Sequence, residues 1–196
     1  MMLTFSSKTS RVIYSALIIF ITGSCTSLGV RSATEPVRLS LDAAATLNRQ
    51  YPVIFLIRHG ERCDRSENKC LSEAAGITRA GAKQASQYGA KFSKKFASFS
   101  LYSSNTVRTV QSATAFSGRG PVISTGLGKC DKSIYGTIKK LAAENKTTVL
   151  FTHNHCLSFI AKDMNKWQTD PGYLDTLVMH EKNDRLYLDG ELVSLQ

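Results

Sequence analysis

The sequence predicts an α/β protein with a largely parallel central sheet. Strand-like and helix-like segments alternate from residue 53 to residue 164, as in parallel sheets joined by helical crossovers. The first strand-like run, residues 53–57, is apolar at every position, which is typical of a strand covered on both faces. With 196 residues, 42% of them hydrophobic and 20% charged, the chain can form one domain with a substantial core.

The expected elements follow one another in regular order. Strands are predicted at short apolar runs, namely residues 53–57, 99–104, 121–125 and 147–153. Helices are predicted at longer segments, namely residues 78–96, 105–116, 131–145 and 156–164. Asn105 is the expected N-cap of the second helix, since its side chain can accept a hydrogen bond from the first turn. The C-terminal tail alternates around Asn183 and Asp184, which predicts a β-hairpin.

The N-terminus predicts export. Lys8 and Arg11 precede an apolar run over residues 12–22, and small residues follow it, as in a secretory signal peptide. The run is shorter than the roughly 20 residues of a transmembrane helix. We therefore divide the chain into three parts, namely a signal peptide over residues 1–30, an N-terminal lead-in over 31–50 and the functional domain over 51–196. The alternatives are a buried N-terminal helix and a lipoprotein anchored through Cys25.

The charge balance predicts an anionic partner. The formal net charge is +10, and it falls to +8 once residues 1–30, which hold Lys8 and Arg11 and no acidic residue, are removed. A basic surface attracts anions. Export argues against nucleic acid, so phosphorylated glycans or the anionic surface of a bacterium are the expected partners. Simple solubility is the alternative explanation of the charge.

Four cysteines remain in the expected mature chain, namely Cys63, Cys70, Cys130 and Cys156. An even number of cysteines in an exported chain predicts two disulfides. Of the three possible pairings we favour Cys63–Cys70, which closes a small local loop, together with Cys130–Cys156. A zinc site and buried thiols are the alternatives, although the spacing matches no zinc-finger pattern.

Three of the predicted strand ends carry cationic or imidazole side chains. Arg58-His59-Gly60-Glu61-Arg62 follows the first strand, Arg108 lies in the first turn of the helix after the second strand, and His153-Asn154-His155 follows a later one. The carboxyl ends of neighbouring parallel strands meet at one edge of a sheet. Because like charges gather only around an anion, and guanidinium groups match phosphate oxygens, we expect a phosphate-binding site. The N-terminus of the helix carrying Arg108 would add backbone donors.

His59 is the expected nucleophile of this site. An imidazole among guanidinium groups resists protonation, and a neutral imidazole can attack phosphorus. Arg58 and Arg108 would stabilise the charge of the transferring phosphoryl group, and His153 would donate a hydrogen bond to it. The reaction needs no metal or other cofactor. The alternative is a metal bound by His153, His155 and Cys156, which we do not favour; His180, in the tail, is expected to be structural.

These motifs resemble the histidine phosphatase superfamily, also called phosphoglycerate mutase-like. The resemblance rests on Arg58-His59-Gly60, on the segment SSNTVRTVQSA at residues 103–113, on His153 and on ITRAG at residues 77–81. It implies a three-layer α/β/α sandwich with a mostly parallel central sheet. It also implies a phosphohistidine at His59 with Arg58, Arg108 and His153 around it, and Arg62 as a further phosphate-binding arginine.

Longer stretches resemble members of this superfamily that act on phosphorylated lipopolysaccharide, for example ERCDRSENKCLS and FTHNHCLSFIAKD. This closer resemblance implies a periplasmic enzyme that removes phosphate from heptose(II) of the lipopolysaccharide core, with no protein partner. The alternatives are a phosphatase for small phosphoesters or phosphohistidine proteins, and a non-catalytic module that binds lipopolysaccharide phosphates. The proton donor is left open among Glu61, Asp64 and Asp131, because Asn154 follows His153 where acid phosphatases often have Asp.

Overall fold

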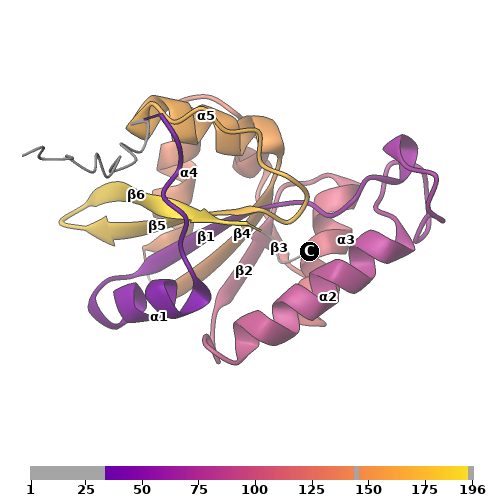
Figure 1. Ribbon diagram of the computed structural model, residues 1–196, viewed down its shortest axis with the longest axis horizontal. Coiled ribbons are helices and arrows are strands. Elements are labelled where there is room, and N and C mark those ends of the chain that lie inside the picture. The colour runs from indigo at the N-terminus through magenta and orange to yellow at the C-terminus, as the bar shows by residue number, and fades with distance from the viewer. Residues whose placement is uncertain (1–33, 144–145, 194–196) are drawn as a thin grey trace, which may run out of the picture. The chain divides into compact units, whose positions relative to one another are not determined.

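A computed structural model describes residues 34–143 and 146–193 of the chain. Its centre is a six-stranded mixed sheet with the order β3-β2-β4-β1-β5-β6 (Figure 1). The strands are β1 (Val53–Arg58), β2 (Ser100–Ser103), β3 (Val122–Ile123), β4 (Thr147–Thr152), β5 (Thr176–Lys182) and β6 (Arg185–Leu192). Strands β3, β2, β4 and β1 are mutually parallel, whereas β5 and β6 form an antiparallel hairpin beside β1. The expected α/β class with a mostly parallel sheet is confirmed.

Helices cover both faces of the sheet. They are α1 (Leu41–Gln50), α2 (Arg79–Ser93), α3 (Val107–Ser117), α4 (Ser133–Ala142) and α5 (Asn154–Asn165), with short 3-10 turns η1 (Cys63–Arg65) and η2 (Thr125–Gly128). Helices α1, α2 and α3 pack on one face, and α4 and α5 pack on the other (Figure 1). The three-layer sandwich implied by the resemblance is therefore confirmed.

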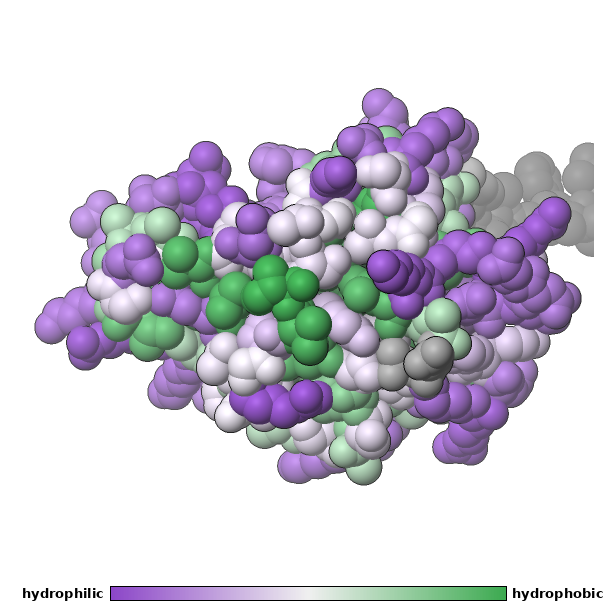
Figure 2. All heavy atoms as spheres, turned by 180° about the vertical axis from the view of Figure 1, so that it is seen from behind, coloured by the Kyte–Doolittle hydropathy of each residue, from purple (hydrophilic) through white to green (hydrophobic). Residues whose placement is uncertain are grey.

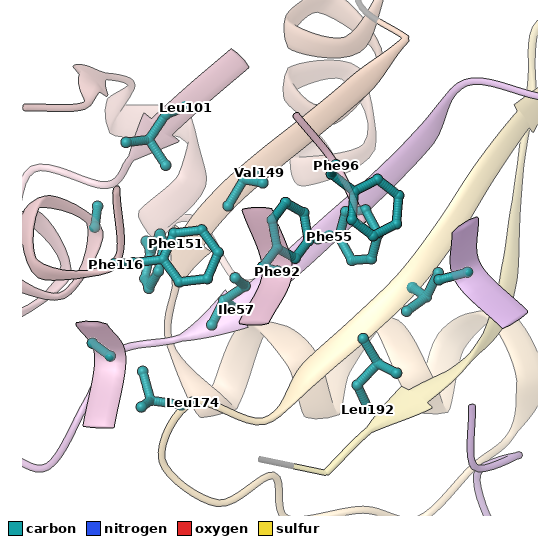
Figure 3. Close-up of a cluster of buried hydrophobic side chains, with 14 of the residues drawn as sticks. Phe55, Ile57, Phe92, Phe96, Leu101, Phe116, Val149, Phe151, Leu174 and Leu192 are labelled. Atoms are coloured by element: carbon teal, nitrogen blue, oxygen red, sulfur yellow. The ribbon is translucent and has the colours of Figure 1, made fainter. Parts of the chain in front are cut away.

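The side chains of β1 point alternately to the two faces of the sheet, and the core accordingly has two halves. Phe55 points into the α1–α2–α3 layer, where its ring lies 4.8 Å from that of Phe92 and 4.9 Å from that of Phe96 (Figure 3). Ile54 and Leu56 point into the α4–α5 layer. Because successive side chains of a strand point to opposite faces, and both faces are covered here, every position of residues 53–57 is apolar and fully buried.

Two helix predictions need correction at their starts. Asn105 is not the N-cap of α3: Thr106 occupies that position, and Asn105 is exposed. The turn into α3 is closed from inside the helix, because the Thr109 hydroxyl donates to the Ser104 carbonyl at 3.0 Å. The lead-in contains α1, which the sequence analysis did not predict; Ser40 caps it by accepting the amide of Ala43 at 3.1 Å.

Other boundaries differ by a few residues. The helix predicted over residues 78–96 ends at Ser93, and Phe96 is buried beyond that end. Strand β3 has only two residues instead of the five predicted, since it lies at the edge of the sheet and pairs with β2 alone. The hairpin turn is confirmed: Asn183 and Asp184 have φ values of 52° and 59°, which suits a tight type I′ turn.

Helices α2 and α3 approach each other closely at Gly89. A Cβ atom on Gly89 would lie 1.7 Å from the backbone oxygen of Phe116, so only glycine fits between the two helices. Gly136, in the exposed part of α4, has no atom within 4 Å of the corresponding position. The spacing between α2 and α3 therefore depends on the missing side chain at Gly89.

The structure contains the disulfides Cys63–Cys70 and Cys130–Cys156, the pairing favoured from the sequence. The predicted signal peptide and Cys25 lie outside the described residues. Within the described ranges, no helix combines the length and apolar character that crossing a membrane requires. Figure 2 shows a face on which polar residues surround a small group of apolar ones. Among the described residues, the most exposed large apolar side chain is Val122 of β3.

Candidate active site

The three strand ends singled out from the sequence lie next to one another. Strand β4 is flanked by β1 and β2, and all three are parallel, so their carboxyl ends share one edge of the sheet. Backbone hydrogen bonds continue past the strands: the amide of His59 donates to Thr152 at 3.1 Å, and that of Ser104 donates to Phe151 at 3.0 Å. The side chains that follow β1, β2 and β4 are thereby held side by side.

His59 is buried with one ring nitrogen occupied. Its Nδ1 lies 2.9 Å from the carbonyl oxygen of Gly60, which can only accept, so the hydrogen is on Nδ1 and Nε2 carries the lone pair. Burial lowers the pKa of His59 to about 3, and the nearby Arg108, His153 and Arg58 contribute to that lowering. Desolvation is therefore a larger cause of the neutral imidazole than the guanidinium groups, which were the only cause expected from the sequence.

His153 occupies the N-cap position of α5, and its ring centroid is 5.7 Å from that of His59. Its Nε2 lies 3.1 Å from the Ser104 hydroxyl, and its Nδ1 lies 3.5 Å from Nη2 of Arg108. Burial, followed by the charge of Arg108, lowers its pKa to about 4. Both histidines are therefore neutral at physiological pH and carry lone pairs.

Arg58 and Arg108 present buried donors without acceptors. The Nε atoms of both side chains have no hydrogen-bond partner among the described residues. Desolvation lowers the pKa of each guanidinium from its ordinary value. Buried polar groups are normally satisfied, and an unsatisfied one is costly. Two such donors beside a helix N-terminus, that of α3, fit a tetrahedral anion.

Arg62 joins this cationic group from the outside. It adds positive charge that helps to lower the pKa of His153 and of Arg108. Its guanidinium binds both carboxylate oxygens of Asp64, and its side chain is 21% exposed. Arg62 is therefore neutralised and solvated more than Arg58 or Arg108, which suits a position at the rim of an anion site.

The carboxylates considered as proton donors are all occupied by hydrogen-bond donors. Glu61 accepts from the hydroxyls of Thr78 and Ser66 and from the Asn68 amide, and these bonds, that from Thr78 first, lower its pKa. The bonded Arg62 lowers the pKa of Asp64.

Asp131 is held in a similar way. It accepts from the amide of Ser133 at 2.8 Å at the start of α4, and this bond lowers its pKa. Each of the three candidates is therefore held in its ionised form.

A loop that the sequence analysis did not single out covers Arg58. Residues 166–175 connect α5 to β5, and the carbonyl of Pro171 accepts from Nη1 of Arg58. The Tyr173 ring lies 4.3 Å from the Arg58 guanidinium and 5.9 Å from the His59 ring. The Asn154 side chain donates to Asp170 of the same loop at 3.4 Å. No sequence periodicity marks this segment, so only the fold reveals its position.

Ser112 is a second residue that the sequence did not reveal. Its hydroxyl accepts from the amide of Gly60 at 2.8 Å and donates to the carbonyl of Arg108 at 2.7 Å. It thereby joins the peptide after His59 to the helix that carries Arg108. The spacing of four residues between Arg108 and Ser112 is the only trace of this role in the sequence.

The other histidines are not arranged as metal ligands. In the described part of the chain, no group of three or more His, Cys, Asp or Glu side chains could hold a metal ion. Cys156 is bonded to Cys130 and is not a ligand beside His153. His180 pairs with Val53 at the start of β1, far along the strand from the site, and its Nδ1 bonds Asp189 at 2.8 Å.

Comparison with known proteins gives consistent matches. The model of the histidine phosphatase superfamily (branch 1) matches residues 54–127. The chain is 51% identical over 154 residues to the lipopolysaccharide core heptose(II)-phosphate phosphatase of Salmonella schwarzengrund, covering 77% of each chain. It is also 51% identical over 152 residues to the protein of that name from Salmonella arizonae, covering 76% of each.

Solved structures match at the level of the fold. A mycobacterial glucosyl-3-phosphoglycerate phosphatase superposes with a TM-score of 0.57 at 12% identity, over 74% of this chain and 100% of the other. A phosphohistidine phosphatase from Agrobacterium tumefaciens, described as putative, superposes with a TM-score of 0.53 at 16% identity, over 73% and 99%. The fold of this chain is thus similar to that of both phosphatases.

Proposed function

The chain belongs to the histidine phosphatase superfamily and is a phosphoric monoester hydrolase, and from this premise we propose that it removes the phosphate from heptose(II) of the lipopolysaccharide core. The reaction passes through a phosphohistidine at His59. One observation carries the proposed chemistry: a buried, neutral imidazole with an available Nε2 lies among arginines whose Nε donors lack partners in the described chain.

In the first step, the Nε2 lone pair of His59 attacks phosphorus and the ester oxygen leaves with the electrons of its bond. The hydrogen bond from Nδ1 to Gly60 keeps the ring oriented and stabilises the positive charge that develops on it. Arg58 and Arg108 bind the phosphoryl oxygens and stabilise their charge in the transition state. In the second step, water attacks phosphorus and returns His59 to its neutral form.

His153 assists as a hydrogen-bond donor to the phosphoryl group. Its Nδ1 faces Nη2 of Arg108, which can only donate, so Nδ1 can carry a hydrogen and donate to phosphate once the phosphate takes the Arg108 donor. In that tautomer Nε2 accepts from the Ser104 hydroxyl, which can donate as well as accept at the observed 3.1 Å. The Ser104 hydroxyl is therefore compatible with the tautomer of His153 that donates to phosphate.

The substrate and the compartment are supported by separate observations. The Salmonella relatives are named for lipopolysaccharide core heptose(II) phosphate, and a net charge that stays at +8 after removal of residues 1–30 favours such an anionic substrate. The signal-like residues 1–30 and two disulfides support an oxidising, extracytoplasmic compartment, which is the periplasm for an enzyme acting on this lipid.

The test uses purified protein and lipopolysaccharide whose core heptose is phosphorylated. Mass spectrometry of the core should show the loss of one phosphate with the wild type and no loss with His59→Ala. Protein quenched in alkaline detergent should carry a base-stable, acid-labile phosphoryl group, which His59→Ala should lack.

Other outcomes would contradict the proposal. Hydrolysis of small phosphoesters without change in lipopolysaccharide would favour a small-phosphoester phosphatase. Binding of lipopolysaccharide with no phosphate release from any ester would favour a non-catalytic binding module. Equal turnover by the wild type and His59→Ala would overturn the nucleophile.

A further inference from the structure

We propose that Asp170, in the loop over Arg58, is the general acid that protonates the leaving oxygen. The inference rests on the proposed function and adds the group that the phosphatase reaction lacks. A sugar alkoxide is a poor leaving group, so the reaction needs a proton at that oxygen. Neither buried histidine supplies it, because the pKa values of His59 and His153 are lowered to about 3 and about 4.

The fold places Asp170 between the segments that carry the two histidines. Asn154, which follows His153, donates its side-chain amide to Asp170 at 3.4 Å. Arg58, which precedes His59, donates to the backbone carbonyl of Pro171, the residue after Asp170. The charge of Asp170 also acts on the Arg58 guanidinium. The Asp170 carboxylate therefore lies beside the site. It comes from the loop between α5 and β5, whereas Glu61 and Asp64 come from the segment after β1.

The other carboxylates of this region already serve as hydrogen-bond acceptors. Glu61 binds three donors, Asp64 binds Arg62 through both oxygens, and Asp131 caps α4. Asp175 is 8% exposed and accepts the amide of Gly172 at 2.6 Å. Asp170 is exposed, and within the described chain only the long contact from Asn154 reaches its carboxylate. Among these carboxylates it is the one that is open to solvent and has the fewest hydrogen bonds in the described chain.

The proton balance of the reaction is complete with this residue. As the bond between His59 Nε2 and phosphorus forms, the ester bond breaks and its electrons stay on the sugar oxygen, which takes the proton of the Asp170 carboxyl. The Asp170 carboxylate then removes a proton from water as that water attacks phosphorus and the N–P bond breaks.

Asn154 acts as a positioning residue for Asp170. Its amide donates to the carboxylate, whereas a carboxylate at residue 154 would repel it. A carboxyl group thus reaches the neighbourhood of His153 from the loop between α5 and β5 and not from the residue after His153. Tyr173, whose ring lies near both Arg58 and His59, is the competing source of a proton.

The test compares leaving groups. The probes are glycerol 1-phosphate, whose alkoxide needs a proton, and p-nitrophenyl phosphate, whose phenolate leaves unprotonated. Asp170→Asn should lower kcat/KM for glycerol 1-phosphate by about 10²–10⁴-fold and that for p-nitrophenyl phosphate by less than about tenfold. The ratio kcat/KM is used because it reports the steps up to leaving-group departure. Asp184→Asn, in the distant hairpin turn, is the matched control and should leave both values unchanged.

If Asp170 had a merely structural role, Asp170→Asn would lower kcat/KM for both esters equally, and that result would overturn the proposal. A selective loss of activity toward glycerol 1-phosphate in Tyr173→Phe, with no such loss in Asp170→Asn, would overturn the proposal as well. That result would assign the proton to Tyr173. Failure of the wild type to release phosphate from either ester and from lipopolysaccharide would reject the proposed function itself, and the inference with it.

Discussion

Replacing His59 with Gln should make the protein less sensitive to acid. The imidazole is 3% exposed, and its pKa falls from 6.5 to about 3 on folding, mainly through burial. Between these two pH values the unfolded chain binds a proton at residue 59 that the folded protein does not. Stability must therefore fall as the pH is lowered from 6.5 towards 3.

The size of this loss of stability follows from how far the pH lies below the pKa of His59 in the unfolded chain. At about pH 5 the solution is about 1.5 pH units below the unfolded pKa and still well above the folded one. At about 1.36 kcal/mol per unit, His59 alone removes about 2 kcal/mol of unfolding free energy between about pH 7 and pH 5. Gln fills a similar space and does not titrate, so the variant lacks this loss. His153 remains in both proteins and contributes equally to each.

Urea denaturation at the two pH values measures the difference. Buffers must contain no phosphate, because an anion bound to the folded site would stabilise it. When the pH is lowered from about 7 to about 5, the unfolding free energy of the wild type should fall by about 2 kcal/mol more than that of His59→Gln. This holds whatever the difference in stability between the two proteins at neutral pH. His155→Gln, at an exposed histidine, is the control and should follow the wild type. Equal losses in wild type and His59→Gln would refute the idea of a buried, neutral imidazole.

Arg108→Ala should lower kcat for p-nitrophenyl phosphate by about 10²–10³-fold in a steady-state assay, because it removes a charge-stabilising donor from the transition state. Joint replacement of Cys63 and Cys70 by Ser should lower the free energy of unfolding by about 2–3 kcal/mol in urea denaturation, since the unfolded chain is no longer closed into a short loop. Gly89→Ala should cost about 3 kcal/mol or more in the same measurement, because the new methyl group meets the Phe116 backbone.

Each of these changes has a control and a contrary result. Arg119→Ala, at an exposed arginine, should keep full activity; similar rates for it and Arg108→Ala would remove Arg108 from the mechanism. An unchanged urea midpoint without the Cys63–Cys70 bond would show that the loop is fixed by other contacts. Gly136→Ala should raise stability by about 0.5–1 kcal/mol, and a gain at Gly89 as well would contradict the helix spacing.

The sequence alone was sufficient to predict that the main cationic and imidazole side chains lie close together. Parallel strands place their carboxyl ends at one edge, so the apolar runs at 53–57 and 147–153 also located Arg58, His59 and His153 relative to one another. The same reasoning failed for Asp170 and the rest of its loop. That loop reaches the site because β5 runs antiparallel to β1, which puts the start of β5 beside the end of β1. No local pattern in residues 166–175 encodes that pairing.

The error at the start of α3 has a similar origin. Asn105 has the side chain of a good N-cap, but the first turn of α3 is closed by Thr109 from within the helix and by the continuation of β2 into Ser104. Helix α1 is different, because local signals favour it: Ser40 is a good N-cap residue and accepts from the amide of Ala43. Tertiary contacts, and not local propensity, decide only the start of α3.

The two sulfur crosslinks lie directly beside residues of the proposed phosphate site: Cys63 follows Arg62, and Cys156 lies one helical turn beyond His153. A newly made chain in a reducing compartment would lack both fastenings, and thermal motion would loosen the segments that they secure. We expect such an enzyme to reach full activity only after oxidation of these cysteines.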